Sequence, residues 1–327
     1  MFPNLIQNTL ELFRIVIDSD DNDPPCLVPL CTLNLPPLNE HASIIRLLCQ
    51  AEPNPIGSGA LAIPEPSRRP FRDKAEDAIM LFSILIEDIP PNGEQLHAPQ
   101  THSFTFIVHR GALAAHIPTE HHGCAPYCCS VVPLGEPVQV PWDAWGIAAT
   151  RWFEGGAAWM PWITTTAGQR AVTMEGDAPA PIIVQDFNPY AVHAARARAA
   201  AAAAAASGSA ASGQSSREQP QEQSREQPQE QSRSRKGQNW SERLPNGNRM
   251  TLKVEESVLP TGALFQEDVR SALPYVEVMT RDEYSYSGVL IDEERILGLK
   301  VRSHLRMFFF NIITRCIQFP SFFLQTN

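Results

Sequence analysis

Proline is spread through almost the whole chain and limits what the chain can fold into. The 327 residues include 29 prolines. Because proline fixes φ and removes a backbone donor, it interrupts helices and central strands. Between the prolines lie short apolar runs, roughly four to eight residues long, that are bounded by glycine, proline or charged residues. This pattern predicts a mainly β protein with many short strands, as in sandwiches, barrels and propellers.

Several of these runs predict a strand directly. The apolar run 76–89 ends at Pro90-Pro91 and indicates a buried strand, with a buried helix left open by its periodicity. Residues 110–116 either extend the preceding strand or form a short helix, and Asn246-Gly247 predicts a hairpin turn. The expected strands are 8–17, 27–35, 44–49, 76–89, 103–109, 138–140, 158–165, 171–174, 182–186, 250–254, 275–280, 289–291 and 295–300.

The sequence predicts one clear helix, which is rich in alanine and spans 190–206. Asn188 is placed to cap it, and Pro189 occupies the first helical position, where the missing N–H costs nothing. Ser207-Gly208 is the expected end. Residues 199–206 are all alanine and give no amphipathic face, so we expect this half to project into solvent and fray.

A low-complexity insert divides the chain. The octapeptide Ser-Arg-Glu-Gln-Pro-Gln-Glu-Gln occurs at 216–223 and again at 224–231. So little apolar area cannot offset the entropy of ordering, and we expect a disordered linker. The predicted organisation is a β-rich propeller-like region at 1–198, the linker at 199–239, a continuation of the β-rich region at 240–300 and an atypical hydrophobic tail at 301–327. We interpret the tail as translated intron sequence.

Charge and cysteine usage exclude some classes of function. The net charge is −10 and no basic patch stands above that background, which argues against a nucleic-acid partner. The tail is broken by Arg315 and Pro320 and is too short to span a membrane. Seven unevenly spaced cysteines without an opening secretory signal favour an intracellular, cytoplasmic or nuclear protein. The sequon at Asn239 then has no consequence.

One cluster of residues could bind a metal, although it matches no standard zinc-binding spacing. Thiolate and imidazole ligands could gather around zinc, and a Cys–His nucleophile is a weaker alternative. No second ligand pair follows at a finger-like distance, so loop cysteines and solvated histidines are the simpler interpretation. The candidates are His116, His121, His122, Cys124, Cys128 and Cys129.

Five tryptophans lie close together in the sequence. They either pack loops and strand edges against a sheet or form an aromatic surface that binds a partner, because tryptophan anchors many interfaces. Packing is the interpretation we favour. These residues are Trp142, Trp145, Trp152, Trp159 and Trp162.

Three further motifs have simple structural interpretations. Asp186-Phe187-Asn188 is similar to a kinase metal-binding tripeptide but lacks the other kinase motifs, so it indicates a strand end and a helix cap. Gly57-Ser58-Gly59 indicates a flexible turn between prolines. The acidic stretch 18–23 indicates a solvated turn, since it lacks the glycine and terminal glutamate of a calcium loop.

Four segments in order resemble a set of basidiomycete fungal proteins in which an F-box precedes a β-propeller-like region. The match covers most of 76–300. The segments are Pro-Trp-Asp-Ala-Trp-Gly at 141–146 with Thr150-Arg151, Ile-Val-Gln-Asp-Phe-Asn at 183–188, Leu-Phe-Gln-Glu-Asp-Val at 264–269 with Leu273-Pro274-Tyr275, and Ile-Asp-Glu-Glu-Arg-Ile-Leu at 291–297.

The resemblance implies a partial propeller-like array of short antiparallel strands and the role of an adaptor. In that family the F-box docks to a cullin ubiquitin ligase while the propeller binds a target. Residues 1–17 are too short for a helical F-box and the early propeller strands are not found, so ligase docking is not expected of this polypeptide. No catalytic residues come with the resemblance.

Together these observations predict a non-enzymatic protein-interaction module with an unidentified protein partner. We assign no catalytic, cofactor-binding or metal-binding residue and expect no cofactor. Two alternatives stay open: a metal-binding or hydrolytic enzyme that uses the His/Cys cluster at 116–129, and a truncated gene model whose product has no independent function.

Overall fold

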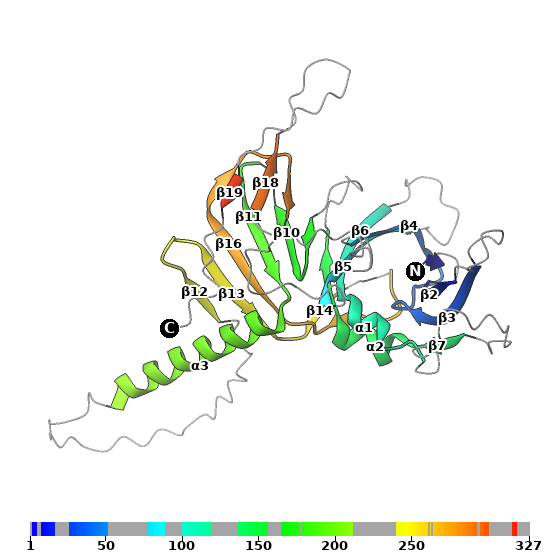
Figure 1. Ribbon diagram of the computed structural model, residues 1–327, viewed down its shortest axis with the longest axis horizontal. Helices are drawn as coiled ribbons and strands as arrows, with labels where there is room; N and C mark the ends of the chain where they lie inside the picture. Colours follow the sequence, from blue (N-terminus) through cyan, green and yellow to red (C-terminus); the bar gives the residue numbers. More distant parts are fainter. Residues whose placement is uncertain are drawn as a thin grey trace, which may run out of the picture.

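Antiparallel β-structure dominates the computed structural model of the chain (Figure 1). The mainly β class predicted from the proline-bounded runs is therefore confirmed. The structure describes residues 2–4, 8–16, 26–51, 77–88, 100–118, 137–155, 165–174, 176, 178–211, 240–260, 262, 264–292, 295–300 and 316–318.

Two four-stranded sheets and two short helices form what we call the first lobe. One sheet has the order β1-β2-β3-β7, in which only β7 runs parallel to its neighbour, and the other is the antiparallel sheet β4-β5-β6-β8. The elements are β1 (Phe2–Asn4), β2 (Thr9–Val16), β3 (Cys26–Asn34), β4 (Ala42–Ala51), β5 (Ile79–Asp88), β6 (Gln100–His109), α1 (Arg110–Ala114), β7 (Val138–Val140), α2 (Trp142–Ala149) and β8 (Thr150–Glu154).

A six-stranded antiparallel sheet is the centre of the second lobe. Its strand order is β12-β13-β16-β11-β10-β9, and it is accompanied by α3 and by the sheet β17-β18-β19. The elements are β9 (Thr166–Ala167), β10 (Arg170–Met174), β11 (Ala180–Asp186), α3 (Pro189–Ala211), β12 (Ser241–Arg243), β13 (Arg249–Lys253), β16 (Tyr275–Tyr284), β17 (Gly288–Ile291), β18 (Arg295–Leu299) and β19 (Cys316–Gln318).

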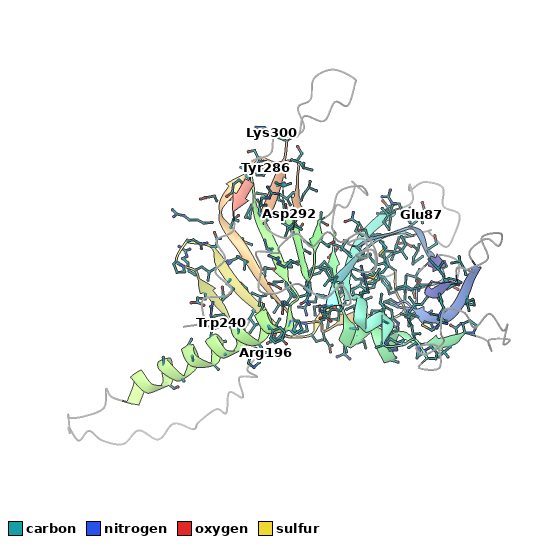
Figure 2. The ribbon with its side chains drawn as sticks, viewed as in Figure 1. Glu87, Arg196, Trp240, Tyr286, Asp292 and Lys300 are labelled. Atoms are coloured by element: carbon teal, nitrogen blue, oxygen red, sulfur yellow. The ribbon has the colours of Figure 1, made fainter. Side chains whose placement is uncertain are left out.

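The sheets pack face to face in series. Side chains of β2 and β3 share one apolar cluster with one face of the β4-β5-β6-β8 sheet. The other face of that sheet meets the six-stranded sheet through a smaller cluster, which we call the seam. The six-stranded sheet then packs its far face against α3, β17 and β18. Trp240 and Tyr286 contact this last core from its two ends (Figure 2).

The chain returns across the insert to complete sheets that it began earlier. Strand β16 pairs with β11, and Ile183 lies opposite Met279. A hairpin of β14 (Ser257–Leu259) and β15 (Val269–Ser271) packs against β8 in the first lobe. The insert therefore interrupts a continuous fold, because strands from both sides of it are hydrogen-bonded neighbours.

Strand β5 shows that the apolar run 76–89 forms a strand, as predicted, and not the buried helix that its periodicity had left open. Its side chains alternate between the two clusters, with Phe82 and Ile84 in the first-lobe core and Ile79 and Leu81 in the seam. Before its acidic end at Glu87-Asp88 this strand has Ser83 as its only polar residue, and one position does not reveal a period, which is why the sequence alone left a buried helix open. The expected strand at 158–165 lies outside the described residues apart from Thr165.

Helix α3 begins where the sequence predicted and ends later. The Asn188 carboxamide oxygen accepts a 2.8 Å hydrogen bond from the Tyr190 backbone N–H, as an N-cap does. The expected stop at Ser207-Gly208 is wrong, because the helix continues to Ala211. The Ser207 hydroxyl donates to the carbonyls of Ala203 and Ala204, which satisfies it within the helix.

Only the first turns of α3 pack against the sheet. Val192 and Ala195 are buried in the second-lobe core, whereas residues 200–205 are exposed as the helix leaves the body (Figure 1). The projection of the polyalanine half is thus as expected. Residues 212–239 of the insert and most of the tail lie outside the described residues, but 316–318 form an edge strand beside β18.

Candidate functional site

Three of the five clustered tryptophans are core residues. Trp142, Trp145 and Trp152 retain only 8%, 2% and 2% of their exposure. The Trp152 ring stacks on Phe106 with 4.8 Å between ring centroids, and Trp142 meets Trp152 edge to face at 5.9 Å. Packing was the favoured interpretation and is confirmed for these three, so they cannot form a partner-binding surface. Trp159 and Trp162 lie outside the described residues.

A helix that the sequence analysis missed positions two of these rings. Helix α2 begins directly after Pro141 and carries Asp143 in its first turn, both of which are helix-start signals. The Trp145 indole N–H donates a 2.8 Å hydrogen bond to the Asn34 carbonyl. Gly146 lies under the Trp142 ring, where the space leaves no room for a side chain. The helix therefore fixes its rings against β3 and the first-lobe core.

The histidine and cysteine cluster is described at one residue only. His116 follows α1, and its backbone N–H donates to the Leu113 carbonyl at 3.3 Å. The other five candidates fall in 119–136, outside the described residues. Within the described part of the chain, no group of three His, Cys, Asp or Glu side chains is arranged to hold a metal ion. The zinc alternative for 116–129 therefore stays a prediction.

The tripeptide at 186–188 is a strand end and a helix cap, as expected. The Asp186 carboxylate accepts a 2.9 Å hydrogen bond from the Asn188 backbone N–H. The Phe187 ring is buried in the seam and stacks on Tyr275 at 5.1 Å. All three side chains therefore have structural partners. Gly57-Ser58-Gly59 and the acidic stretch 18–23 lie outside the described residues.

Arg151 joins the two lobes at the seam. In the sequence it was noted only as part of the segment that resembles the fungal family, and no role was predicted for it. Its guanidinium lies 5.2 Å from the centre of the Tyr275 ring and donates a 2.7 Å hydrogen bond to the Glu255 carbonyl. Burial lowers the pKa of Arg151, while Tyr275 and Glu277 act in the opposite direction and favour the charged form. Because the Tyr275 ring and the Glu255 carbonyl stabilise its charge, the buried Arg151 guanidinium can link the two lobes.

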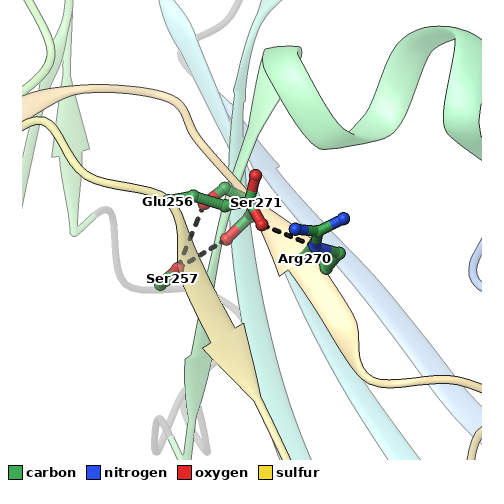
Figure 3. Close-up of polar contacts among 4 residues, drawn as sticks. All are labelled: Glu256, Ser257, Arg270 and Ser271. Atoms are coloured by element: carbon green, nitrogen blue, oxygen red, sulfur yellow. Dashed lines mark hydrogen bonds and ion pairs between the residues drawn. The ribbon is translucent and has the colours of Figure 1, made fainter.

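A pair of serines joins the two strands of the β14-β15 hairpin (Figure 3), and the hairpin packs against β8. The Ser257 and Ser271 hydroxyl oxygens lie 2.8 Å apart, and the Ser271 oxygen accepts a 3.0 Å bond from the Trp152 backbone N–H. Ser271 is fully buried, so its hydroxyl serves packing. Glu256 and Arg270 close the hairpin's exposed side with an ion pair of 2.5 Å. Exposed pairs of this kind contribute little stability.

Among the described residues, the most exposed apolar pair of cross-strand neighbours lies on the outer face of the β1-β2-β3-β7 sheet. Ile15 and Leu27 are cross-strand partners at the ends of β2 and β3, and they are 64% and 46% exposed. Phe13 lies opposite the exposed Pro29 one step along the same face. Cross-strand partners project to one side of a sheet, so these apolar side chains form a continuous strip.

Comparison with protein-family models, with curated proteins and with solved structures gives no match for this chain. Within the described residues, no helix is long and apolar enough to cross a membrane.

Proposed function

We propose that this chain is a non-enzymatic protein-interaction module. The observation that carries the proposal is the pair Ile15 and Leu27, which keep 64% and 46% of their surface in water on adjacent strands. Single exposed apolar residues are common, but neighbours that add up to a strip are typical of contact surfaces. We call the surface formed by Ile15, Leu27 and Pro29 the β2-β3 strip.

The sequence that joins β2 to β3 is acidic, which favours one kind of partner for the β2-β3 strip. The connection from β2 to β3, residues 17–25, contains Asp18, Asp20, Asp21 and Asp23 and no lysine or arginine. The whole chain also has a net charge of −10. Complementary charge raises association rates and selects partners, so the fitting occupant is a protein surface with apolar side chains beside lysine or arginine.

We further propose that the fold is a partial propeller-like array, as the resemblance to fungal F-box proteins implies. The serial face-to-face packing of four sheets supports this, because propeller blades also pack each face on a neighbouring blade. In this proposal the chain corresponds to the target-binding part of such an adaptor. Docking to a ubiquitin ligase would need an F-box, and we do not assign it to the residues at hand.

A binding experiment with matched variants tests the interaction proposal. Full-length protein is used to capture partners from a lysate of the source organism, and each candidate is then purified and titrated directly. We expect Ile15→Ser with Leu27→Ser to weaken binding at least about tenfold, as loss of a central apolar contact does. Val258→Ser is the matched control, because Val258 is 49% exposed on a different sheet.

Two outcomes would count against the proposal. One is a partner that binds the wild-type protein and the double variant equally well. The other is that folded wild-type protein, checked by circular dichroism, recovers no specific partner. Metal analysis of the purified protein separates the enzymatic alternative: stoichiometric zinc lost on replacing Cys124 and Cys128 by serine would favour the cluster at 116–129.

A further inference from the structure

Three exposed arginines lie around the hairpin that joins β12 to β13. Arg243 on β12 and Arg249 on β13 are direct cross-strand partners, so their side chains project to the same side of the sheet. The side chain of Arg281 lies against Gly247 in the turn, because a Cβ at that glycine would be 2.8 Å from Arg281 Cδ. The Arg281 backbone N–H also donates a 3.1 Å bond to the side chain of Asn248, the residue before Arg249.

No carboxylate in the described part of the chain forms an ion pair with Arg243, Arg249 or Arg281. Like charges directly opposite each other on a sheet repel and destabilise it. Arg249 Nη2 lies 3.4 Å from the sulfur of Met279, which carries no charge. A chain of net charge −10 thus holds three cations together at one corner of a sheet, and an oxyanion is the group that would relieve their repulsion.

The surroundings of the arginines suit a single oxyanion better than a long polyanion. Guanidinium groups bind carboxylate and phosphate through paired N–H donors. The Ser241 hydroxyl, two residues from Arg243 on the same face, accepts a 3.3 Å bond from Thr251 and keeps its own proton for an acceptor. Glu277 lies opposite Thr251, and Glu283 lies two residues beyond Arg281. These carboxylates would repel a nucleic-acid backbone that continued past the arginines.

Strand β12 adds a second feature, because it is the outermost strand of the six-stranded sheet (Figure 1). The Trp240 carbonyl and the Leu244 N–H bond inward, to β13 and to its turn. Backbone groups alternate between the two sides of a strand, which turns the N–H and C=O groups of Ser241 and Arg243 outward. An extended peptide can pair with an edge of this kind.

We propose that β12 and the three arginines form a docking site for an extended peptide that carries a carboxylate or a phosphate. The peptide adds as a strand beside β12, and its acidic side chain projects to the face where Arg243 and Arg249 lie. Main-chain bonds to the edge give affinity, and the side-chain contact selects the partner. This site belongs to the second lobe and the β2-β3 strip to the first, so the two interactions can be tested independently.

Fluorescence anisotropy of labelled peptides with the full-length protein tests the role of the charge. The probe is the peptide Thr-Val-Thr-Glu-Thr-Val-Thr, together with versions that have phosphoserine or glutamine at the centre. We expect the glutamate and phosphoserine peptides to bind at least about tenfold more tightly than the glutamine peptide, as charge-assisted hydrogen bonds allow. Equal binding of the charged and uncharged peptides would overturn the proposal.

Matched variants of the protein identify the cations that are used. Arg243→Gln and Arg249→Gln should each weaken binding of the glutamate peptide about fivefold. Arg196→Gln should leave binding unchanged, because Arg196 is exposed on α3, which packs against the opposite face of the sheet. A loss of the same size in all three variants would mean that only the overall charge of the protein matters, and would contradict the site.

An N-methylated peptide separates strand pairing from simple attraction between charges. Methyl groups on alternate backbone nitrogens, the central one included, remove the donors that face β12 and keep the glutamate. The methylated peptide and inorganic phosphate should each bind at least about tenfold more weakly than the unmodified peptide. Undiminished binding of the methylated peptide would exclude docking at the edge, and tighter binding of a single-stranded DNA oligomer would assign the arginines to nucleic acid instead.

The melting temperature of the Arg243→Gln protein checks that the arginines are available to a ligand. Without a carboxylate partner in the chain, loss of this charge relieves repulsion with Arg249, and the variant should melt at the wild-type temperature or slightly above it. A fall of more than about 4 °C would show that Arg243 is already paired within the protein, and the docking site would be ruled out.

Discussion

The two lobes bury their apolar surface with different kinds of side chain. The first-lobe core is built around aromatic rings, with Phe106 stacked between Phe82 and Trp152 at centroid distances of 4.6 and 4.8 Å. The second-lobe core consists mostly of valine, isoleucine, leucine and methionine from the six-stranded sheet, such as Ile182 and Met250. Aromatic rings add directional contacts to their burial, whereas aliphatic side chains contribute mainly through area and fit.

Both cores include residues from beyond the insert. The aromatic core needs Phe265, which comes from beyond the insert and meets Phe104 at 5.7 Å. The Asn39 side chain holds that segment through a 2.9 Å bond to the Phe265 carbonyl. The first lobe is therefore completed only when the end of the chain returns to it, so its stability depends on contacts that are distant in sequence.

The largest expected effect compares one central residue from each core. We expect Phe106→Ala to cost about 3–5 kcal/mol of unfolding free energy and Ile182→Ala about 2–5 kcal/mol. Phe106 should exceed Ile182 by at least about 1 kcal/mol, because each stacked ring contributes about 0.5–1.5 kcal/mol beyond its burial. Urea unfolding followed by tryptophan fluorescence and by circular dichroism measures both. Equal losses would show that stacking adds nothing to the first-lobe core.

The second effect concerns the tight fit around α2. Gly146→Ala adds a methyl group that meets the Trp142 ring, and we expect a loss of about 1–3 kcal/mol. Helix propensity alone predicts the opposite sign, a gain of about 1 kcal/mol. Gly208→Ala in the last turns of α3 is the matched control, where propensity should prevail and helicity should rise. A more stable Gly146→Ala protein would mean that the ring moves without cost.

The third effect tests how the second lobe holds its helix. Asn188→Ala removes the side-chain oxygen that accepts the Tyr190 N–H, and we expect a loss of about 0.5–2 kcal/mol. Asn188→Asp keeps a cap and should retain most of that stability. Tyr190→Ala changes a side chain that is 85% exposed and should stay within about 0.5 kcal/mol of wild type. Equal stability of the alanine and aspartate variants at position 188 would contradict the cap.

The last prediction concerns the chemical reactivity of a thiol in the first lobe. Desolvation by the surrounding protein raises the pKa of the Cys49 thiol to about 11, although part of the residue is exposed to solvent, and burial also raises the pKa of Cys31. A raised pKa disfavours the thiolate, so Cys49 should react slowly at pH 8. Alkylation of Cys49, followed by peptide mass spectrometry, should accelerate about tenfold per pH unit and level off near pH 11.

Cys31 is the internal control for that experiment. It is 1% exposed in the first-lobe core and should react only after unfolding in urea. A plateau for Cys49 near pH 9 would show an ordinary thiol and would contradict the raised pKa. Rapid labelling of Cys31 in the native protein would show that the first-lobe core opens readily.

Local signals in the sequence predicted much of the secondary structure. The cap at Asn188-Pro189 fixed the start of α3, and Asn246-Gly247 gave the turn between β12 and β13, in which Gly247 has a φ of 86°. Helix α2 was missed because its tryptophans suggested sheet packing more strongly than Pro141 and Asp143 suggested a helix start. The hydrogen bonds that define the Asn188 cap and the Asn246-Gly247 turn join residues close together in the sequence, so both features can be predicted from local sequence alone.

The candidate sites were less predictable. Nothing in the sequence marks Ile15 and Leu27 as neighbours, since their meeting depends on a register that includes a bulge after Leu12. Gln50 and Thr166 are ordinary polar residues on separate strands until the lobes pack. Their burial follows from which surfaces face each other, and one residue of slip in either strand would turn each side chain to the opposite face.

Sequence patterns alone were enough to predict that the body is made of short strands, that α3 starts at Asn188-Pro189 and that its polyalanine part extends from the body. Those outcomes follow from backbone dihedral preferences, from the missing N–H of proline and from the capping ability of asparagine, which are properties of the residues themselves and do not depend on their neighbours in space. Tertiary packing was needed to show that three tryptophans are core, that Ile15 stays in water and that Gln50 meets Thr165 across the seam. Burial is a property of neighbours, and the neighbours here come from distant parts of the chain.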